Sequence, residues 1–135
     1  MKNLILTIAI ILFGIASNAQ TETRTSFYPN NKLKSEIPFV DGKINGTLKK
    51  YYQNGKLESE SVFVNDSLNG LTKRYFENGK IKSEATYVND LLNGTEKIYH
   101  KNGNLKYETE YENNDQVGDT KVYDKNGKLI VPKNR

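Results

Sequence analysis

The sequence predicts an all-β fold, an elongated antiparallel meander of repeated β-hairpins, preceded by a signal-peptide helix. Three observations carry this prediction. A unit recurs every 24 residues, and an Asn-Gly pair stands at the same place in successive units. The runs on either side of each pair alternate apolar and polar residues. Asn-Gly between alternating runs is the strongest short-range signal for a hairpin.

The first 19 residues have the pattern of a signal peptide. Lys2 supplies the positive start, residues 4–15 are mostly apolar, and Ser17-Asn18-Ala19 places small residues at a cleavage site. The apolar run is shorter than the roughly 20 residues of a membrane-spanning helix. We expect an exported chain that begins at Gln20 and resides in the periplasm, on the outer surface or outside the cell. Residues 20–26 are expected to form a short linker, and residues 132–135 a tail.

Composition excludes several classes of site and partner. The chain contains no cysteine, which excludes disulfides, a lipid anchor on cysteine, and zinc or iron–sulfur sites built on thiolates. Without Lys2, 19 basic residues face 16 acidic ones, with the two signs interleaved. This balance gives little reason to expect a nucleic-acid partner.

The repeat domain is predicted to span residues 27–131. Its units are residues 27–50, 51–74, 75–98 and 99–122, followed by a partial unit at 123–131. Positions that recur in each unit are expected to be structural: Tyr51, Gly55, Leu57, Glu60, Phe63, Gly70, Tyr75, Gly79, Ile81, Glu84, Tyr87, Gly94, Tyr99, Gly103, Leu105, Glu108, Tyr111 and Gly118.

Two registers are open for the hairpin around Asn54-Gly55. A two-residue turn would pair Tyr52 with Leu57, whereas a three-residue loop with a glycine bulge would pair Tyr51 with Leu57. We favour the second, because it should place the repeated Tyr, Leu and Phe/Tyr positions in one apolar stripe.

The second turn of each unit is expected to be a longer loop, as in residues 64–70. Its aliphatic residue, such as Leu68, is expected to tuck under the sheet edge. The corresponding loop of the fourth unit, residues 113–118, departs from the pattern and is expected to be looser.

The unit resembles a known repeat. Tyr51-x-x-Asn54-Gly55-Lys56-Leu57-x-x-Glu60, repeated in register, is similar to the variant MORN repeat of small bacterial proteins of the YwqK type. The resemblance implies an extended, twisted sheet of hairpins used for binding, in a bacterial protein. Related proteins are linked to scaffolding and membrane attachment, and some are described as antitoxin-like.

A search for catalytic residues yields no convincing set. The single histidine, His100, occupies a place that Tyr52, Phe76 and Asp124 hold in other units, so the fold does not require it. No cysteine or second histidine completes a triad or a zinc site. We expect no enzyme activity and no cofactor.

Two recurrent acidic features have architectural explanations. The glutamate recurring at the place of Glu60 could suggest paired acid and base carboxylates, but a residue repeated in every unit is expected to pair with a lysine or a backbone amide of a neighbouring strand. Asn65, Asp66 and Asn69 could offer oxygens to calcium, but their spacing is not that of an EF-hand loop. We expect no metal site.

The leading functional hypothesis is a protein-interaction or scaffold module in the bacterial envelope. The alternatives are binding of anionic lipid or glycan, or an antitoxin-like role. Lysines at the place of Lys49 in each unit would supply the charge for a lipid or glycan surface. Positions where the copies differ are the candidate binding surface, namely Tyr52, Phe76, His100 and Tyr107. The oligomeric state stays open, because both sheet edges could pair.

Overall fold

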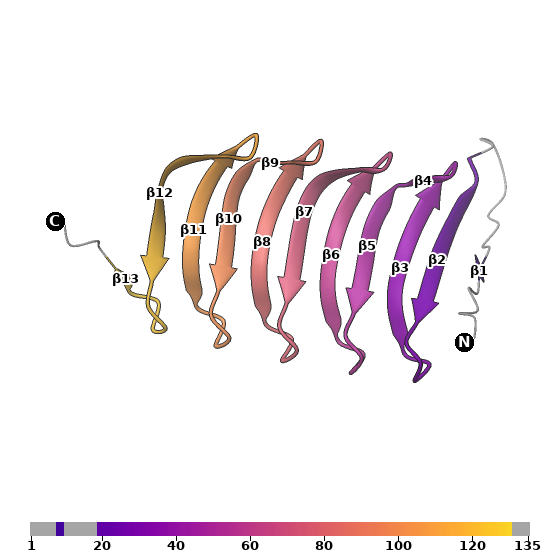
Figure 1. Cartoon of the computed structure of the whole chain (residues 1–135), viewed down its shortest axis with the longest axis horizontal. Coiled ribbons are helices and arrows are strands. Elements are labelled where there is room, and N and C mark those ends of the chain that lie inside the picture. Colours follow the sequence, from indigo (N-terminus) through magenta and orange to yellow (C-terminus); the bar gives the residue numbers. More distant parts are fainter. Residues whose placement is uncertain (1–7, 10–18, 131–135) are drawn as a thin grey trace.

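A computed structural model describes residues 8–9 and 19–130 of the chain. These residues form one open antiparallel sheet in a single layer, whose strands follow one another in chain order (Figure 1). The strands are β1 (Ile8–Ala9), β2 (Thr21–Phe27), β3 (Leu33–Val40), β4 (Lys43–Ile44), β5 (Gly46–Tyr51), β6 (Leu57–Val64), β7 (Ser67–Tyr75), β8 (Ile81–Val88), β9 (Leu91–Leu92), β10 (Gly94–Tyr99), β11 (Leu105–Glu112), β12 (Asp115–Tyr123) and β13 (Leu129–Ile130). The predicted meander of hairpins is confirmed.

The N-terminal part of the sheet begins earlier than predicted. Residues 20–26 are not a linker, because Thr21–Phe27 forms the full strand β2, paired along its length with β3. Ile8 and Ala9 form β1, which pairs with Arg24 and Thr23 of β2. The rest of the expected signal helix and the 132–135 tail lie outside the described residues. No helix in the described part of the chain is long and apolar enough to cross a membrane.

The hairpin around Asn54-Gly55 has the favoured register. The Gly55 amide donates to the Tyr52 carbonyl at 2.8 Å, and the Tyr52 amide donates to the Lys56 carbonyl at 2.8 Å. Gly55 has a φ of 87°, as a glycine bulge requires, and Tyr51 pairs with Leu57. The three-residue loop is therefore confirmed.

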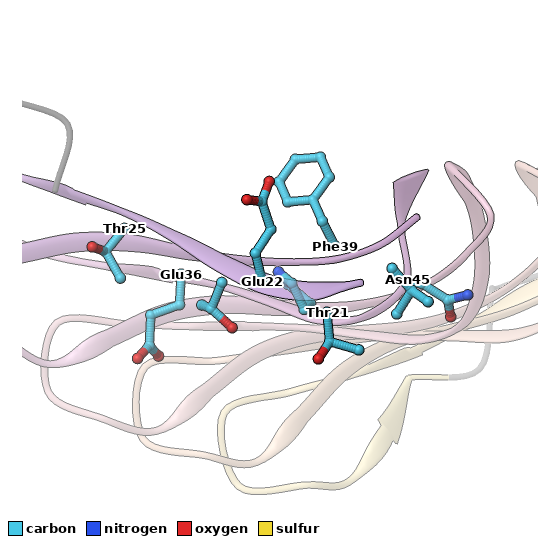
Figure 2. A pocket seen from close by; sticks show the side chains of 9 residues that line it. Thr21, Glu22, Thr25, Glu36, Phe39 and Asn45 are labelled. Atoms are coloured by element: carbon cyan, nitrogen blue, oxygen red, sulfur yellow. The ribbon is translucent and has the colours of Figure 1, made fainter. Parts of the chain in front are cut away.

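The apolar stripe expected from that register does not form. A second irregularity between Lys50 and Tyr51 shifts the pairing, so that Lys49 lies opposite Glu60. The Tyr51 hydroxyl consequently reaches the glutamate side, where it contacts Glu36 at 2.6 Å. Phe63 lies three residues beyond Glu60 in regular strand and points to the other face. Figure 2 shows the same separation in the first unit, where Phe39 and Glu36 project from opposite sides of the sheet.

The second turn is tighter than predicted. Asn65 and Asp66 have φ values of 50° and 70°, and Val64 pairs directly with Ser67. Two successive positive φ values define a two-residue type I′ turn, so the expected long loop at 64–70 is wrong. Leu68 pairs with Phe63 within the ladder rather than tucking under an edge.

The fourth unit has the same turn. Asn113 and Asn114 have φ values of 50° and 73°, close to those of Asn65 and Asp66. The looser loop expected at 113–118 is therefore wrong, because the turn has only two central residues and β12 begins at Asp115. Asn and Asp are the residues, after glycine, that most readily accept this conformation.

A single layer leaves little interior. Among the described residues, only Ala85, Ser35 and Thr109 are buried, with 7%, 9% and 6% of their surface exposed. Hydrophobic burial is thus shared thinly over many half-exposed side chains. Hydrogen bonds between neighbouring units assume a correspondingly larger share of the stabilisation.

Candidate functional site

The recurrent glutamates and lysines form one transverse line, here called the charge row. Cross-strand pairs run in the order Glu36, Lys49, Glu60, Lys73, Glu84, Lys97, Glu108 and Lys121. The prediction that each glutamate meets a lysine of a neighbouring strand is confirmed. The lysines do not form a separate positive ladder, because the row alternates in sign. The lysine-ladder basis for binding anionic lipid or glycan is therefore wrong.

Tyrosines extend the charge row between units. The hydroxyls of Tyr51, Tyr75 and Tyr99 donate to Glu36, Glu60 and Glu84 at 2.6, 2.7 and 2.7 Å. Burial of the hydroxyl, then the hydrogen bond to the carboxylate and its negative charge, raise the pKa of each tyrosine to about 12. The unit-starting tyrosines are structural cross-links between consecutive units.

These tyrosines predict a late step in the alkaline titration. In the unfolded chain a tyrosine pKa is about 10, so the fold favours the neutral hydroxyl. The contribution of the three bonds to stability should be constant below pH about 10 and should disappear as pH rises to about 12. Tyrosinate absorbance should show an ionisation step near pH 12 that loses about a third of its amplitude in Tyr75→Phe. An unchanged amplitude in that variant would contradict the assignment.

The type I′ turns provide a second link between units. The Asp66 amide donates to the Ile44 carbonyl at 2.9 Å, and an Asp66 carboxylate oxygen accepts from the Ile44 amide at 2.7 Å. Asp90 makes the same two contacts with Leu68. The backbone hydrogen bond from Leu68 and a hydrogen bond from Ser67 lower the Asp90 pKa. We call this arrangement the turn clamp.

Hydrogen bonds at the same turns engage the side-chain oxygens of Asn65 and Asp66, two of the three residues considered as calcium ligands. The side-chain oxygen of Asn65 accepts from the side-chain nitrogen of Asn45 at 3.3 Å, and the side-chain nitrogen of Asn69 donates to the side-chain oxygen of Asn89 at 3.3 Å. Within the described residues, no three His, Asp or Glu side chains are grouped as metal ligands.

A third link involves the position occupied by Tyr52, Phe76 and His100. The Tyr52 hydroxyl bonds to the Tyr75 carbonyl at 2.6 Å, and His100 Nε2 lies 3.1 Å from the Tyr123 carbonyl. Tyr28 of the first unit has the same role. Tyr52 and His100 therefore have a structural role, contrary to our expectation that the fold does not determine the residue at this position. Phe76 has no polar atom and cannot make this bond.

Two hollows adjoin Phe76. One, of about 440 Å³, is lined by Phe76, Tyr99, His100 and the lysines Lys101, Lys106 and Lys125, together with Asn102. The other, of about 460 Å³, is lined by Tyr52, Phe76, Glu77, Asn78 and Lys101. We call the two together the Phe76 groove. Three of the four predicted binding residues thus gather in one place.

Tyr107, the fourth predicted residue, does not line the Phe76 groove. Its ring lies 4.8 Å from the Lys106 ammonium group, which does line it. The lysines of the groove were not predicted from the sequence. A signal was available, because Lys101 and Lys125 occupy the place held by Gln53 and Glu77 in earlier units.

A further hollow of about 470 Å³ lies at the first strands (Figure 2). Thr21, Thr23 and Thr25 line it with Glu36 and other residues of β3. It contains hydroxyls and carboxylates but no lysine or arginine. Its chemistry therefore differs from that of the Phe76 groove.

Phe76→Tyr should stabilise the fold. The new hydroxyl is expected to donate to the Tyr99 carbonyl, as Tyr52 does to Tyr75, and to raise the free energy of unfolding by about 1 kcal/mol. Urea denaturation would measure the gain. Tyr52→Phe is the matched reverse change and should cost a similar amount. A destabilised Phe76→Tyr variant would contradict the proposed equivalence of the two positions.

The comparison with known families agrees with this architecture. The MORN repeat variant family matches residues 23–41, 44–65, 68–89, 92–113 and 116–131. These five segments span most of the chain, which therefore belongs to the MORN repeat variant family. Such repeats are generally modules for interaction with proteins or lipids. No curated protein and no solved structure matches the chain.

Proposed function

We propose that the protein is an exported, non-enzymatic interaction module of the bacterial envelope, whose principal partner is another protein. The repeats build a rigid display surface, and residues that differ between copies give that surface its specificity. The signal-like N-terminus favours an envelope partner over the intracellular toxin that a YwqK-type, antitoxin-like affiliation would imply.

An exposed apolar patch carries this proposal. Val64, Leu71, Val88 and Leu91 have 43%, 40%, 45% and 38% of their surface exposed. The pairs Val64–Ser67, Leu71–Thr86 and Val88–Leu91 place these side chains on the face that carries the charge row. Several exposed aliphatic side chains gathered on one face typically mark a protein interface.

An acidic region borders the apolar patch on the same face. At the places held by Val64, Ser67 and Leu71, the fourth unit has Glu112, Asp115 and Asp119, and Glu110 lies alongside. Strand β10 lies between β8 and β11, and the hydroxyl of its Thr95 donates to Glu110 at 2.6 Å. The complementary partner is a protein segment with apolar side chains followed by lysines or arginines.

The fourth unit itself supplies the test. Val88→Glu combined with Leu91→Asp copies residues Glu112 and Asp115 into the third unit, where the fold should tolerate them. Capture experiments with immobilised protein and envelope extracts should recover a partner with the parent and lose it with this variant. Asn30→Asp with Gln53→Glu adds the same charge at exposed turns and should retain the partner. Equal recovery by both variants would refute the assignment of the surface.

Export has its own test. Protein recovered from outside the cytoplasm should begin at Gln20, immediately after the small residues at 17–19. Recovered protein that still begins at Met1 would contradict cleavage.

A further inference from the structure

We infer that the Phe76 groove binds an acidic polysaccharide, with rings stacking on the sugars and lysines pairing with their carboxylates. This site is separate from the apolar patch and does not depend on the protein partner proposed above. The inference rests on the charge of the groove, the placement of its rings and the break in the repeat at Phe76.

The charge of the groove is unbalanced, unlike that of the charge row. The hollow of about 440 Å³ is lined by Lys101, Lys106 and Lys125 and by no acidic residue. The ion pairs found among the described residues involve none of these three lysines. Glu77 is the only acidic residue that lines the hollow of about 460 Å³. Three ammonium groups without carboxylate partners around one concave surface favour an anionic ligand.

The rings of the groove favour a ligand with flat, partly apolar faces. Tyr52, Phe76 and His100 occupy equivalent positions in consecutive units, and each is partly exposed. Equivalent positions lie two strands apart, roughly 9.6 Å in a sheet with about 4.8 Å between strands. A polymer that crosses the strands would therefore meet one ring in each unit. Sugar rings present the apolar C–H faces that aromatic side chains contact, and uronic acids add a carboxylate to each ring.

The identity of residue 76 supports a binding role. Tyr28, Tyr52 and His100 each link their unit to the next through a carbonyl, and phenylalanine forgoes that bond. Phe76 lines both hollows, so its ring lies between them. Phenylalanine at position 76 loses a structural hydrogen bond at the centre of a cationic groove. Contact between its ring and a ligand explains why phenylalanine stands there.

Titration of the purified protein with oligogalacturonate, followed by calorimetry, tests the inference. Binding is expected for oligogalacturonate and not for its fully methyl-esterified form, which has the same backbone without charge. Phe76→Ala should weaken binding about tenfold, which corresponds to about 1.4 kcal/mol. The triple variant Lys101→Ala, Lys106→Ala, Lys125→Ala should abolish it.

A second triple variant controls for net charge. Lys32→Ala, Lys43→Ala, Lys50→Ala removes three exposed lysines from the first unit and should leave binding within about twofold of the parent. Thermal unfolding of every variant verifies that the fold persists. The inference is overturned by absent binding, by equal binding of the methyl ester, or by equal loss in both triple variants. Equal affinity for polyglutamate or for phosphatidylglycerol vesicles would also overturn it, since charge alone would then suffice.

Discussion

Gly70→Ala should lower the free energy of unfolding by about 3 kcal/mol, the largest effect expected of a single methyl group in this chain. Gly70 has a φ of 136°, where a β-carbon is strained, and a β-carbon built there would lie 2.8 Å from Cβ of Val62. The Val62 contact cannot be relieved by rotating a side chain, because Cβ is fixed to the backbone. Strand β6 or β7 would have to move.

Gly55→Ala is the matched control. Gly55 also has a positive φ, 87°, but no atom lies within 4 Å of its hypothetical β-carbon. This variant should therefore lose only the conformational part, about 1 kcal/mol. Urea denaturation of both variants separates the two contributions. If Gly55→Ala and Gly70→Ala were equally destabilised, the close approach between β6 and β7 at Val62 would be refuted.

The hairpin architecture could be predicted because each unit contains the turn residues that determine its own hairpin. Asn54-Gly55 specifies a three-residue loop with a glycine bulge, and its recurrence every 24 residues specifies the array. The two faces could not be assigned, because a second bulge, with Glu58 as the extra residue opposite Lys50 and Tyr51, inverts the alternation on which such assignments rest. Nothing in the composition of those residues marks that bulge.

The second turn could have been predicted. In the first unit its two central residues are Asp41 and Gly42, a pair typical of type I′ turns. Aligning this pair with Asn65 and Asp66 would have indicated a two-residue turn in every unit. The expectation of a longer loop gave too much weight to the polar residues that follow, which belong to β7.

The candidate site was predicted in part. Comparing copies identified Tyr52, Phe76 and His100, which the structure brings together at the groove. The lysines of the groove were not predicted, although Lys101 and Lys125 differ from Gln53 and Glu77 at the same place in earlier units. Lys106 and Lys125 lie 19 positions apart and meet only because the sheet places consecutive units side by side.

Asp66→Ala should lower the free energy of unfolding by about 2 kcal/mol, the second largest effect we expect. Alanine removes the carboxylate oxygen that accepts from the Ile44 amide at 2.7 Å, and it is strained at the Asp66 φ of 70°. The loss falls on the junction between the first two units. Because each unit contacts mainly its neighbours, a weakened junction should also reduce cooperativity, measured as a smaller dependence of unfolding free energy on urea.

Two further substitutions at Asp66 separate these causes. Asp66→Asn should stay within about 0.5 kcal/mol of the parent, because Asn114 adopts a φ of 73° and accepts from the Leu92 amide at 2.7 Å in the same role. Asp66→Gly relieves the strain but not the lost hydrogen bond, so it should fall between Asn and Ala. If stability decreases from Asp66→Asn through Asp66→Gly to Asp66→Ala, then both the side-chain hydrogen bond and the turn conformation contribute to it. If Gly matched Asn, the side-chain bond from the Ile44 amide would contribute nothing to stability, and the turn clamp would depend on its backbone dihedrals and on the bond from the residue 66 amide to the Ile44 carbonyl.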